Sequence, residues 1–272
     1  MSYLDQKKYW NKNLDIQNIK ECLQPDFLDS FDLETEKKFY LSPEQIYAYQ
    51  KAQDLKNKKV LEIGAGIGIN ALIMAEKGAN VFALDISKER LHLLKRLSER
   101  YNFSESIHPC IMPAELLGFK DESFDIVYTK SVLIHLDLEK VIPEIYRVLK
   151  KGGKAIFVEP LKYHPVVNLY RRFCAPKEWR TLAKYFSIKS IEEVGKKFDD
   201  FHHKEFFLKS FISFMWQFKF RNADKFIKSL NRWNKVDIFL LKLFPFLKHL
   251  CWMSVLVCEK KDSLNHEEHK AQ

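Results

Sequence analysis

The feature that most constrains the fold is a short apolar run that leads into three glycines at alternate positions, within residues 60–68. Only eight glycines occur in the 272 residues, so this cluster reflects a local demand of the backbone. Glycines let the chain turn sharply from a buried strand into a helix, whose first N–H groups stay free for a ligand. The segment therefore predicts a strand–turn–helix unit with a ligand site at the turn.

Around this turn the hydrophobic periodicity alternates between strand and helix. We predict strands at 59–64, 80–87, 106–112, 123–133 and 154–160. Between some of these strands we predict helices, at 70–78, 88–101 and 138–150. After an irregular stretch, we predict a helix near 191–198, a strand near 202–211, a helix within 231–250 and a last strand at 252–260. Strands that alternate with helices form a parallel sheet, so the predicted fold is α/β.

The chain divides into four predicted segments. Residues 1–55 form an N-terminal helical cap, in which Ser42 caps a helix that begins at Pro43 and runs through Leu55. Residues 56–160 form the ligand-binding core, and 161–262 combine an insertion after the fifth strand, expected to bind a second substrate, with the completing strands. Residues 263–272 read as a disordered tail.

Charge, cysteine content and the lack of long apolar runs limit the possible partners and the cellular location of the protein. The net charge of +9 suits either general solubility or an anionic partner, and both readings stay open. The five cysteines are scattered, which argues against a disulfide framework or a zinc site, and we predict no metal. The sequence lacks an N-terminal apolar region and any apolar run of about 18 residues. We therefore predict a cytoplasmic protein without a membrane span, for which peripheral membrane contact stays open.

Two acidic residues flank the glycine turn. Glu62 lies on the strand two positions before Gly64, where a carboxylate favours a cationic ligand and disfavours a pyrophosphate. Ile69 occupies the position of the last glycine in the dinucleotide fingerprint, so that fingerprint fails. Asp85 ends the second strand, from which a carboxylate reaches both hydroxyls of a ribose. The predicted ligand is thus an adenosine compound with a cationic group and no phosphate.

Four segments resemble the class I S-adenosylmethionine-dependent methyltransferases, in their methyltransferase-11-type small-molecule branch. They read LEIGAGIG, ALDIS, FDIVYTKSVLIHL and EIYRVLKKGGKAIFVEP, and the resemblance covers residues 58–160. It implies a Rossmann-like sheet of seven strands in the order 3-2-1-4-5-7-6, mostly parallel, with helices on both faces and the final strand antiparallel. It also implies S-adenosylmethionine as cofactor and methyl transfer to an oxygen or nitrogen of a small-molecule, glycan or lipid-linked acceptor.

The resemblance carries over to particular residues. Glu62, Gly64 and Gly66 would line the methionine portion and Asp85 would bind the ribose, while Pro113 departs from the usual acid of the adenine stretch. The predicted cofactor-binding residues are Glu62, Gly64, Ala65, Gly66, Asp85, Ile86, Ala114, Glu115 and Lys130.

On the acceptor side, His135 and His164 are the candidate bases for a hydroxyl acceptor, although methyl transfer does not require one. We expect Tyr9 and Trp10 to roof the pocket together with an insertion carrying His164 and residues 170–172. The adjacent arginines there suit an anionic acceptor, and the late aromatic residues suit a lipid-like one.

Three other functions compete with this prediction. An NAD-type oxidoreductase is disfavoured by Glu62 and Ile69. A binding protein that kept the fold without catalysis stays open. A nucleic-acid methyltransferase also stays open, but no separate basic domain or RNA module accompanies the positive charge, so nucleic acid is not the expected partner.

Overall fold

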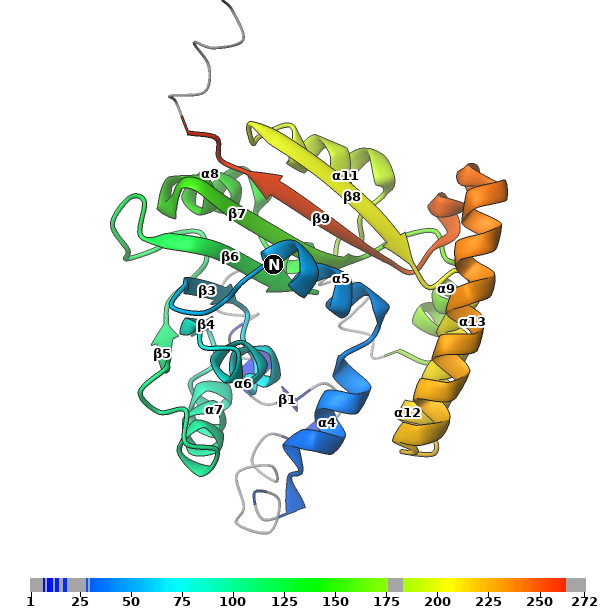
Figure 1. The fold of residues 1–272 in the computed structure, drawn as a ribbon, viewed down its shortest axis with the longest axis horizontal. Helices are drawn as coiled ribbons and strands as arrows, with labels where there is room; N and C mark the ends of the chain where they lie inside the picture. Colours follow the sequence, from blue (N-terminus) through cyan, green and yellow to red (C-terminus); the bar gives the residue numbers. More distant parts are fainter. Residues whose placement is uncertain are drawn as a thin grey trace, which may run out of the picture.

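The computed structural model describes residues 7, 9–11, 13–14, 17–18, 28, 30–175 and 183–262 (Figure 1). Its main feature is a seven-stranded sheet in the order β5-β4-β3-β6-β7-β9-β8. The strands are β3 (Lys59–Ile63), β4 (Asn80–Asp85), β5 (Ile107–Ile111), β6 (Phe124–Lys130), β7 (Leu149–Pro160), β8 (Asp200–Phe206) and β9 (Met253–Glu259). Strand β9 runs antiparallel to both of its neighbours, and the other pairs are parallel. This order confirms the predicted Rossmann-like arrangement.

Helices cover both faces of the sheet (Figure 1). One face carries α5 (Pro43–Ala52), α6 (Ile69–Glu76) and α7 (Lys88–Arg100), and the other carries α8 (Leu138–Val148) and α11 (Ile188–Gly195). Each face has its own apolar core, because side chains alternate across a strand. Val60 and Leu61 of β3 accordingly belong to different cores.

The N-terminal extension differs in part from its prediction. Helix α4 (Leu33–Tyr40) is capped by Asp32, and α5 begins at Pro43 as predicted but ends at Ala52, before Leu55. Before them, β1 (Asn13–Leu14) pairs with β2 (Gln17–Asn18), so the prediction of helix throughout was wrong there. Asparagine has low helix propensity and favours turns, which is the physical reason.

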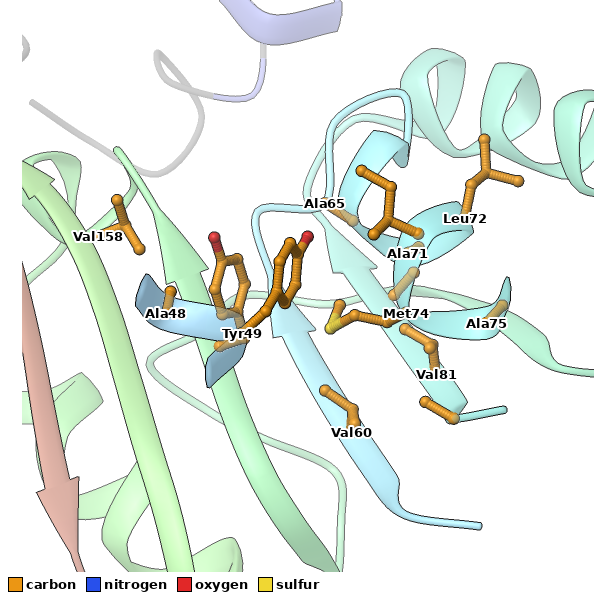
Figure 2. Packing of buried hydrophobic residues seen from close by; sticks show 14 of the residues in the cluster. Ala48, Tyr49, Val60, Ala65, Ala71, Leu72, Met74, Ala75, Val81 and Val158 are labelled. Atoms are coloured by element: carbon orange, nitrogen blue, oxygen red, sulfur yellow. The ribbon is translucent and has the colours of Figure 1, made fainter. Parts of the chain in front are cut away.

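The hydroxyl of Ser42 does not cap α5 either. It donates to Oε1 of Glu44 over 2.7 Å. Tyr49 of α5 lies in the same core as Ala71 and Met74 of α6 and Ala65 of the glycine turn (Figure 2). The N-terminal helices are thereby packed directly beside the predicted ligand turn.

The segment after β7 is mostly helical. It contains α9 (Pro165–Phe173), η2 (Ser210–Ser213), α12 (Phe214–Phe218), α13 (Ala223–Leu243) and η3 (Pro245–Leu250). Figure 1 shows α9, α12 and α13 together on one side of the molecule. Strand β8 ends at Phe206 instead of 211, because Phe207 has a φ of 66° and Asp237 of α13 accepts the next backbone N–H groups. The predicted tail, 263–272, and Cys22 lie outside the described residues.

Candidate functional site

The three glycines of the turn between β3 and α6 serve different purposes. All have positive φ, at 72°, 58° and 84° for Gly64, Gly66 and Gly68. A Cβ atom on Gly64 would lie 2.3 Å from Val132, and one on Gly68 would lie 2.0 Å from Leu94. At Gly66 the nearest atom would be Nη1 of Arg90, 3.5 Å away. Gly64 and Gly68 are therefore required by the packing of the protein, whereas Gly66 leaves space for a ligand against the backbone.

Asp85 is buried at the end of β4 and holds the glycine turn in place. Its carboxylate accepts the N–H of Gly66 over 2.9 Å and that of Ser87 over 2.8 Å. Burial raises the pKa of this carboxyl, against the opposing charge of Arg90. The N-cap of α7 is the Ser87 hydroxyl, so Asp85 is not needed as a helix cap. Ile86, next to it, is half-buried.

Glu62 is buried on β3, on the sheet face that carries α6. The side chain of Asn70 and the backbone N–H of Ala71 donate hydrogen bonds to its carboxylate, yet Oε2 has no partner among the described residues. Burial raises the pKa of Glu62 to about 8, and the negative charge of Asp85 adds to this shift. A buried carboxylate oxygen without a partner is costly, and a cationic ligand group would satisfy it. The site therefore fits the ammonium group of S-adenosylmethionine.

Lys130, at the end of β6, faces the N-terminal helices. Its Nζ lies 3.6 Å from Oε1 of Glu44 and 4.1 Å from the centroid of the Tyr40 ring. Burial lowers the pKa of Lys130, while the charges of Glu44 and Glu62 oppose the shift. Sequence reasoning missed Tyr40 and Glu44. The available signal was a carboxylate on the apolar, core-facing side of a predicted helix.

Glu159 was also missed, although it lies within a segment that we predicted correctly as a strand. It is fully buried near the end of β7, where its Oε1 accepts the Thr129 hydroxyl at 2.9 Å. The same oxygen accepts the N–H groups of Val132 and Leu133 at 3.2 and 3.1 Å. Burial raises the pKa of Glu159 to about 7, and these hydrogen bonds oppose the shift. Glu159 thus holds the loop between β6 and η1 (Leu133–His135) in place.

Trp10 lies between two parts of the site. Its ring centroid is 5.5 Å from that of His135, edge to face, and 4.6 Å from Cζ of Arg90. Arg90 lies in the first turn of α7, which follows β4, and His135 is the last residue of η1, which follows β6. Trp10 therefore lies beside the segments that follow β4 and β6, on the side where the sequence predicted a roof over the pocket.

His164 has both ring nitrogens engaged. It is buried at the N-cap of α9, where Nδ1 accepts the N–H of Val167 over 3.2 Å. Nε2 lies 3.2 Å from the carbonyl oxygen of Leu208, to which it donates, and the ring packs edge to face on Phe211. Burial lowers its pKa. This geometry ties α9 to the segment after β8.

The remaining predicted residues lie around this centre. Ala114 is buried just after β5, whose last residue pairs with Asp85, so this segment reaches the same edge of the sheet. Oε1 of Glu115 accepts the N–H of Asp137 at 3.4 Å.

The two arginines of α9 have different surroundings. Arg171 donates to the carbonyl oxygen of Leu161 at 2.9 Å and to Oδ1 of Asn168 at 3.0 Å, and it stacks 3.5 Å from the Tyr185 ring centroid. Arg172 is exposed, so the two side chains do not form one anion-binding pair. Within the described part of the chain, no group of three or more His, Cys, Asp or Glu side chains is arranged to hold a metal ion. None of the helices described there combines the length and the apolar character that crossing a membrane requires.

The fold and this site together define a class I S-adenosylmethionine-dependent methyltransferase. The family model for the methyltransferase domain matches residues 61–157. An uncharacterized protein of Methanocaldococcus jannaschii is 32% identical over 201 residues, which cover 72% of this chain and 76% of that protein. Phosphoethanolamine N-methyltransferase 2 of Caenorhabditis elegans is 33% identical over 169 residues, covering 58% of this chain but only 37% of the relative.

A solved structure agrees in fold. Phosphoethanolamine N-methyltransferase 2 of Haemonchus contortus, in complex with phosphomonomethylethanolamine and S-adenosylhomocysteine, superposes with a TM-score of 0.60 at 18% identity. The match covers 92% of this chain and 61% of that one. The chain belongs to the class I S-adenosylmethionine-dependent methyltransferases, in the branch that acts on small molecules.

Proposed function

We propose that this enzyme transfers the methyl group of S-adenosylmethionine to an oxygen or nitrogen atom of a small-molecule, glycan or lipid-linked acceptor. The observation that carries the proposal is the buried Oε2 of Glu62, which has no hydrogen-bond partner among the described residues, together with the open backbone at Gly66. A carboxylate in that position favours a ligand with a positive charge and no phosphate, which separates S-adenosylmethionine from NAD.

We assign the cofactor contacts as follows. Glu62 binds the ammonium group, the backbone of residues 64–66 lies along the methionine portion, and Asp85 binds the ribose hydroxyls. Ile86, Ala114 and Glu115 line the adenine. Lys130 stays paired with Glu44 and positions the N-terminal helices against the cofactor, with its charge balancing that of Glu62.

S-adenosylmethionine supplies an electrophilic methyl carbon attached to a sulfonium that is already a good leaving group. The protein's contribution is therefore mainly alignment and exclusion of water. Trp10 covers the site from the N-terminal side, and the loop held by Glu159 forms the acceptor side. His135, at the end of η1 just after that loop, would accept a proton from a hydroxyl acceptor. Because both nitrogens of His164 are engaged, we assign it a positioning role on α9 instead of that of a base.

An anionic acceptor group is part of the proposal. The bound acceptor of the H. contortus enzyme, phosphomonomethylethanolamine, carries a phosphate. Here the exposed Arg172 on α9 could hold such a group, since a guanidinium pairs well with phosphate or carboxylate. Arg171 would support it indirectly by fixing α9 to Leu161.

The test is transfer of an isotopically labelled methyl group. The purified chain is incubated with methyl-labelled S-adenosylmethionine and, in separate reactions, with the small-molecule, glycan, lipid and nucleic-acid fractions of a cell extract. The labelled product is identified by mass spectrometry. Label in a small molecule, absent with Asp85→Ala, supports the proposal. Cofactor binding by calorimetry without transfer to any fraction would favour a non-catalytic binding protein. Label confined to nucleic acid would favour the nucleic-acid methyltransferase.

A further inference from the structure

Large apolar side chains that face solvent are concentrated in one part of the chain. Eighteen are exposed among the described residues, and fifteen of these lie between Tyr163 and Leu250. Six lie in the second half of α13, at the residue between α13 and η3, and in η3, namely Ile238, Phe239, Leu243, Phe244, Phe246 and Leu250. Phe239 and Phe246 are 64% and 66% exposed. Exposed apolar groups gathered on one element mark an interaction surface.

The rotation of α13 about its axis is determined by its buried face. Phe226, Leu230 and Asp237 are the buried residues of this helix. Asp237 fixes the register, because its carboxylate accepts the N–H groups of residues 208–210 at 3.0, 2.8 and 3.1 Å and the hydroxyl of Ser210 at 2.5 Å. The opposite side of the helix is therefore held toward solvent, and Figure 1 shows α13 along one side of the molecule.

That opposite side combines basic and aromatic residues in one stripe. At helical spacing it presents Lys228, Arg232, Lys235, Phe239 and Lys242, all exposed, which we call the outer stripe of α13.

The charge of this region is one-sided. Residues 207–250 contain nine lysines and arginines against two aspartates, in a chain whose net charge is +9. Of those aspartates, Asp237 is turned inward, and Asp224 in the first turn lies 3.7 Å from Lys38. The outer stripe itself contains no acidic residue.

We propose that the outer stripe of α13, together with η3, docks on the surface of an anionic lipid bilayer. Phe239, Leu243 and Phe246 would enter the interface, where aromatic and apolar side chains are stabilised, and the basic residues would contact lipid phosphates. A second copy of this chain suits the surface poorly, because a symmetric contact would place lysines opposite lysines. The proposal is independent of the methyl acceptor, since it concerns only where the enzyme binds.

The test is flotation of the full chain with vesicles. We expect binding to phosphatidylcholine vesicles that contain phosphatidylglycerol, at least tenfold weaker binding to phosphatidylcholine alone, and loss of binding as salt rises. The triple variant Lys228→Glu, Arg232→Glu, Lys235→Glu should weaken binding to the anionic vesicles at least tenfold. Phe239→Ser with Phe246→Ser should weaken it by about tenfold, because it removes the apolar anchors.

Control variants carry substitutions of the same kind elsewhere on the surface. Lys196→Glu with Lys197→Glu alters exposed charges just after α11, and Leu116→Ser removes a residue that is 73% exposed. Both should leave vesicle binding unchanged, and all variants should keep the wild-type circular dichroism and cofactor affinity.

Three results would overturn the proposal. The first is no vesicle binding, or equal loss in the control variants. The second is a dimer in sedimentation velocity that Phe239→Ser abolishes, which would assign the stripe to a second copy. The third is displacement from vesicles by RNA that binds the stripe more tightly than the lipid does.

Discussion

Glu62→Gln is the substitution that most directly tests how the cofactor is held. In the ligand-free protein burial raises the pKa of Glu62 to about 8, so the carboxyl is protonated at neutral pH. Oε2 of Glu62 has no partner in the part of the chain that the structure describes. An ammonium group placed against it stabilises the ionised form and lowers this pKa. Cofactor binding should therefore release a proton from Glu62, and the substitution should abolish that release.

The magnitude follows from the pKa. Between about pH 5.5 and 7 the α-amino group of the ligand stays protonated, while Glu62 must ionise to bind it. Affinity should then rise about tenfold per pH unit, which corresponds to 1.4 kcal/mol. At pH 7 ionising Glu62 costs about 1.4 kcal/mol, and the charge-assisted contact contributes about 3 kcal/mol. Glu62→Gln should therefore weaken binding roughly tenfold at pH 7 and remove the pH dependence.

The assay is isothermal titration calorimetry with S-adenosylmethionine in buffers of different ionisation enthalpy, which reports the number of protons released. We expect close to one proton per bound ligand at pH 6.5 for the wild type, and none from this position in Glu62→Gln. Glu105→Gln, at an exposed position, is the matched control and should behave as the wild type. An unchanged pH slope and proton release in Glu62→Gln would refute the assignment of the ammonium site.

Four further outcomes are expected. Asp85→Ala should weaken S-adenosylmethionine binding by roughly 10- to 1,000-fold in calorimetry, because it removes the hydrogen bonds that we assign to the ribose and also the acceptor of the Gly66 and Ser87 N–H groups. Gly66→Val should abolish cofactor binding, because the side chain fills the space against the backbone, and its φ of 58° adds local strain that lowers the melting temperature. Circular dichroism should still report a folded protein, since a Cβ there meets only the Arg90 side chain at 3.5 Å. Arg171→Ala should lower the melting temperature, whereas Arg172→Ala should raise only the KM of an anionic acceptor. Because the pKa of Glu159 is raised to about 7, the folded state favours its protonated form, and this contribution to stability is lost as pH rises from about 4.5 to 7. Glu159→Gln should remove that loss. In urea unfolding, the free energy of unfolding of the wild type should fall by about 1–3 kcal/mol more than that of the variant between pH 4.5 and pH 8.

Periodicity predicted most of the sheet, because buried parallel strands and amphipathic helices differ in local pattern. The resemblance added the strand order, which periodicity does not contain. One strand boundary was mispredicted because it depends on a residue far along the chain. Strand β8 ends early because Asp237, up to 29 residues further along the chain, accepts the N–H groups that would otherwise continue the ladder.

The residues that we assign to the cofactor could be predicted from the sequence more directly than those that we assign to the acceptor. Glu62, Gly66 and Asp85 could be predicted because each lies at a fixed sequence distance from one strand–turn–helix unit. The contact of Lys130 with Glu44 joins β6 to a helix that precedes the core, and no local pattern predicts it. His164 was a reasonable candidate base by position, and only its two hydrogen bonds reveal its place as a helix cap.

Two buried glutamates, the predicted Glu62 and the missed Glu159, have similar surroundings. Glu62 and Glu159 lie near the ends of β3 and β7, and burial raises the pKa of both. Each also has one carboxylate oxygen without a hydrogen bond among the described residues. Such groups lower stability unless something is gained, and proteins break local rules mainly at functional sites. For Glu62 we propose that the gain is an oxygen that binds the cationic group of the cofactor. For Glu159 it is a fixed loop between β6 and η1, just before His135. In the proposed function, Glu62 therefore holds the cofactor and Glu159 shapes the acceptor side.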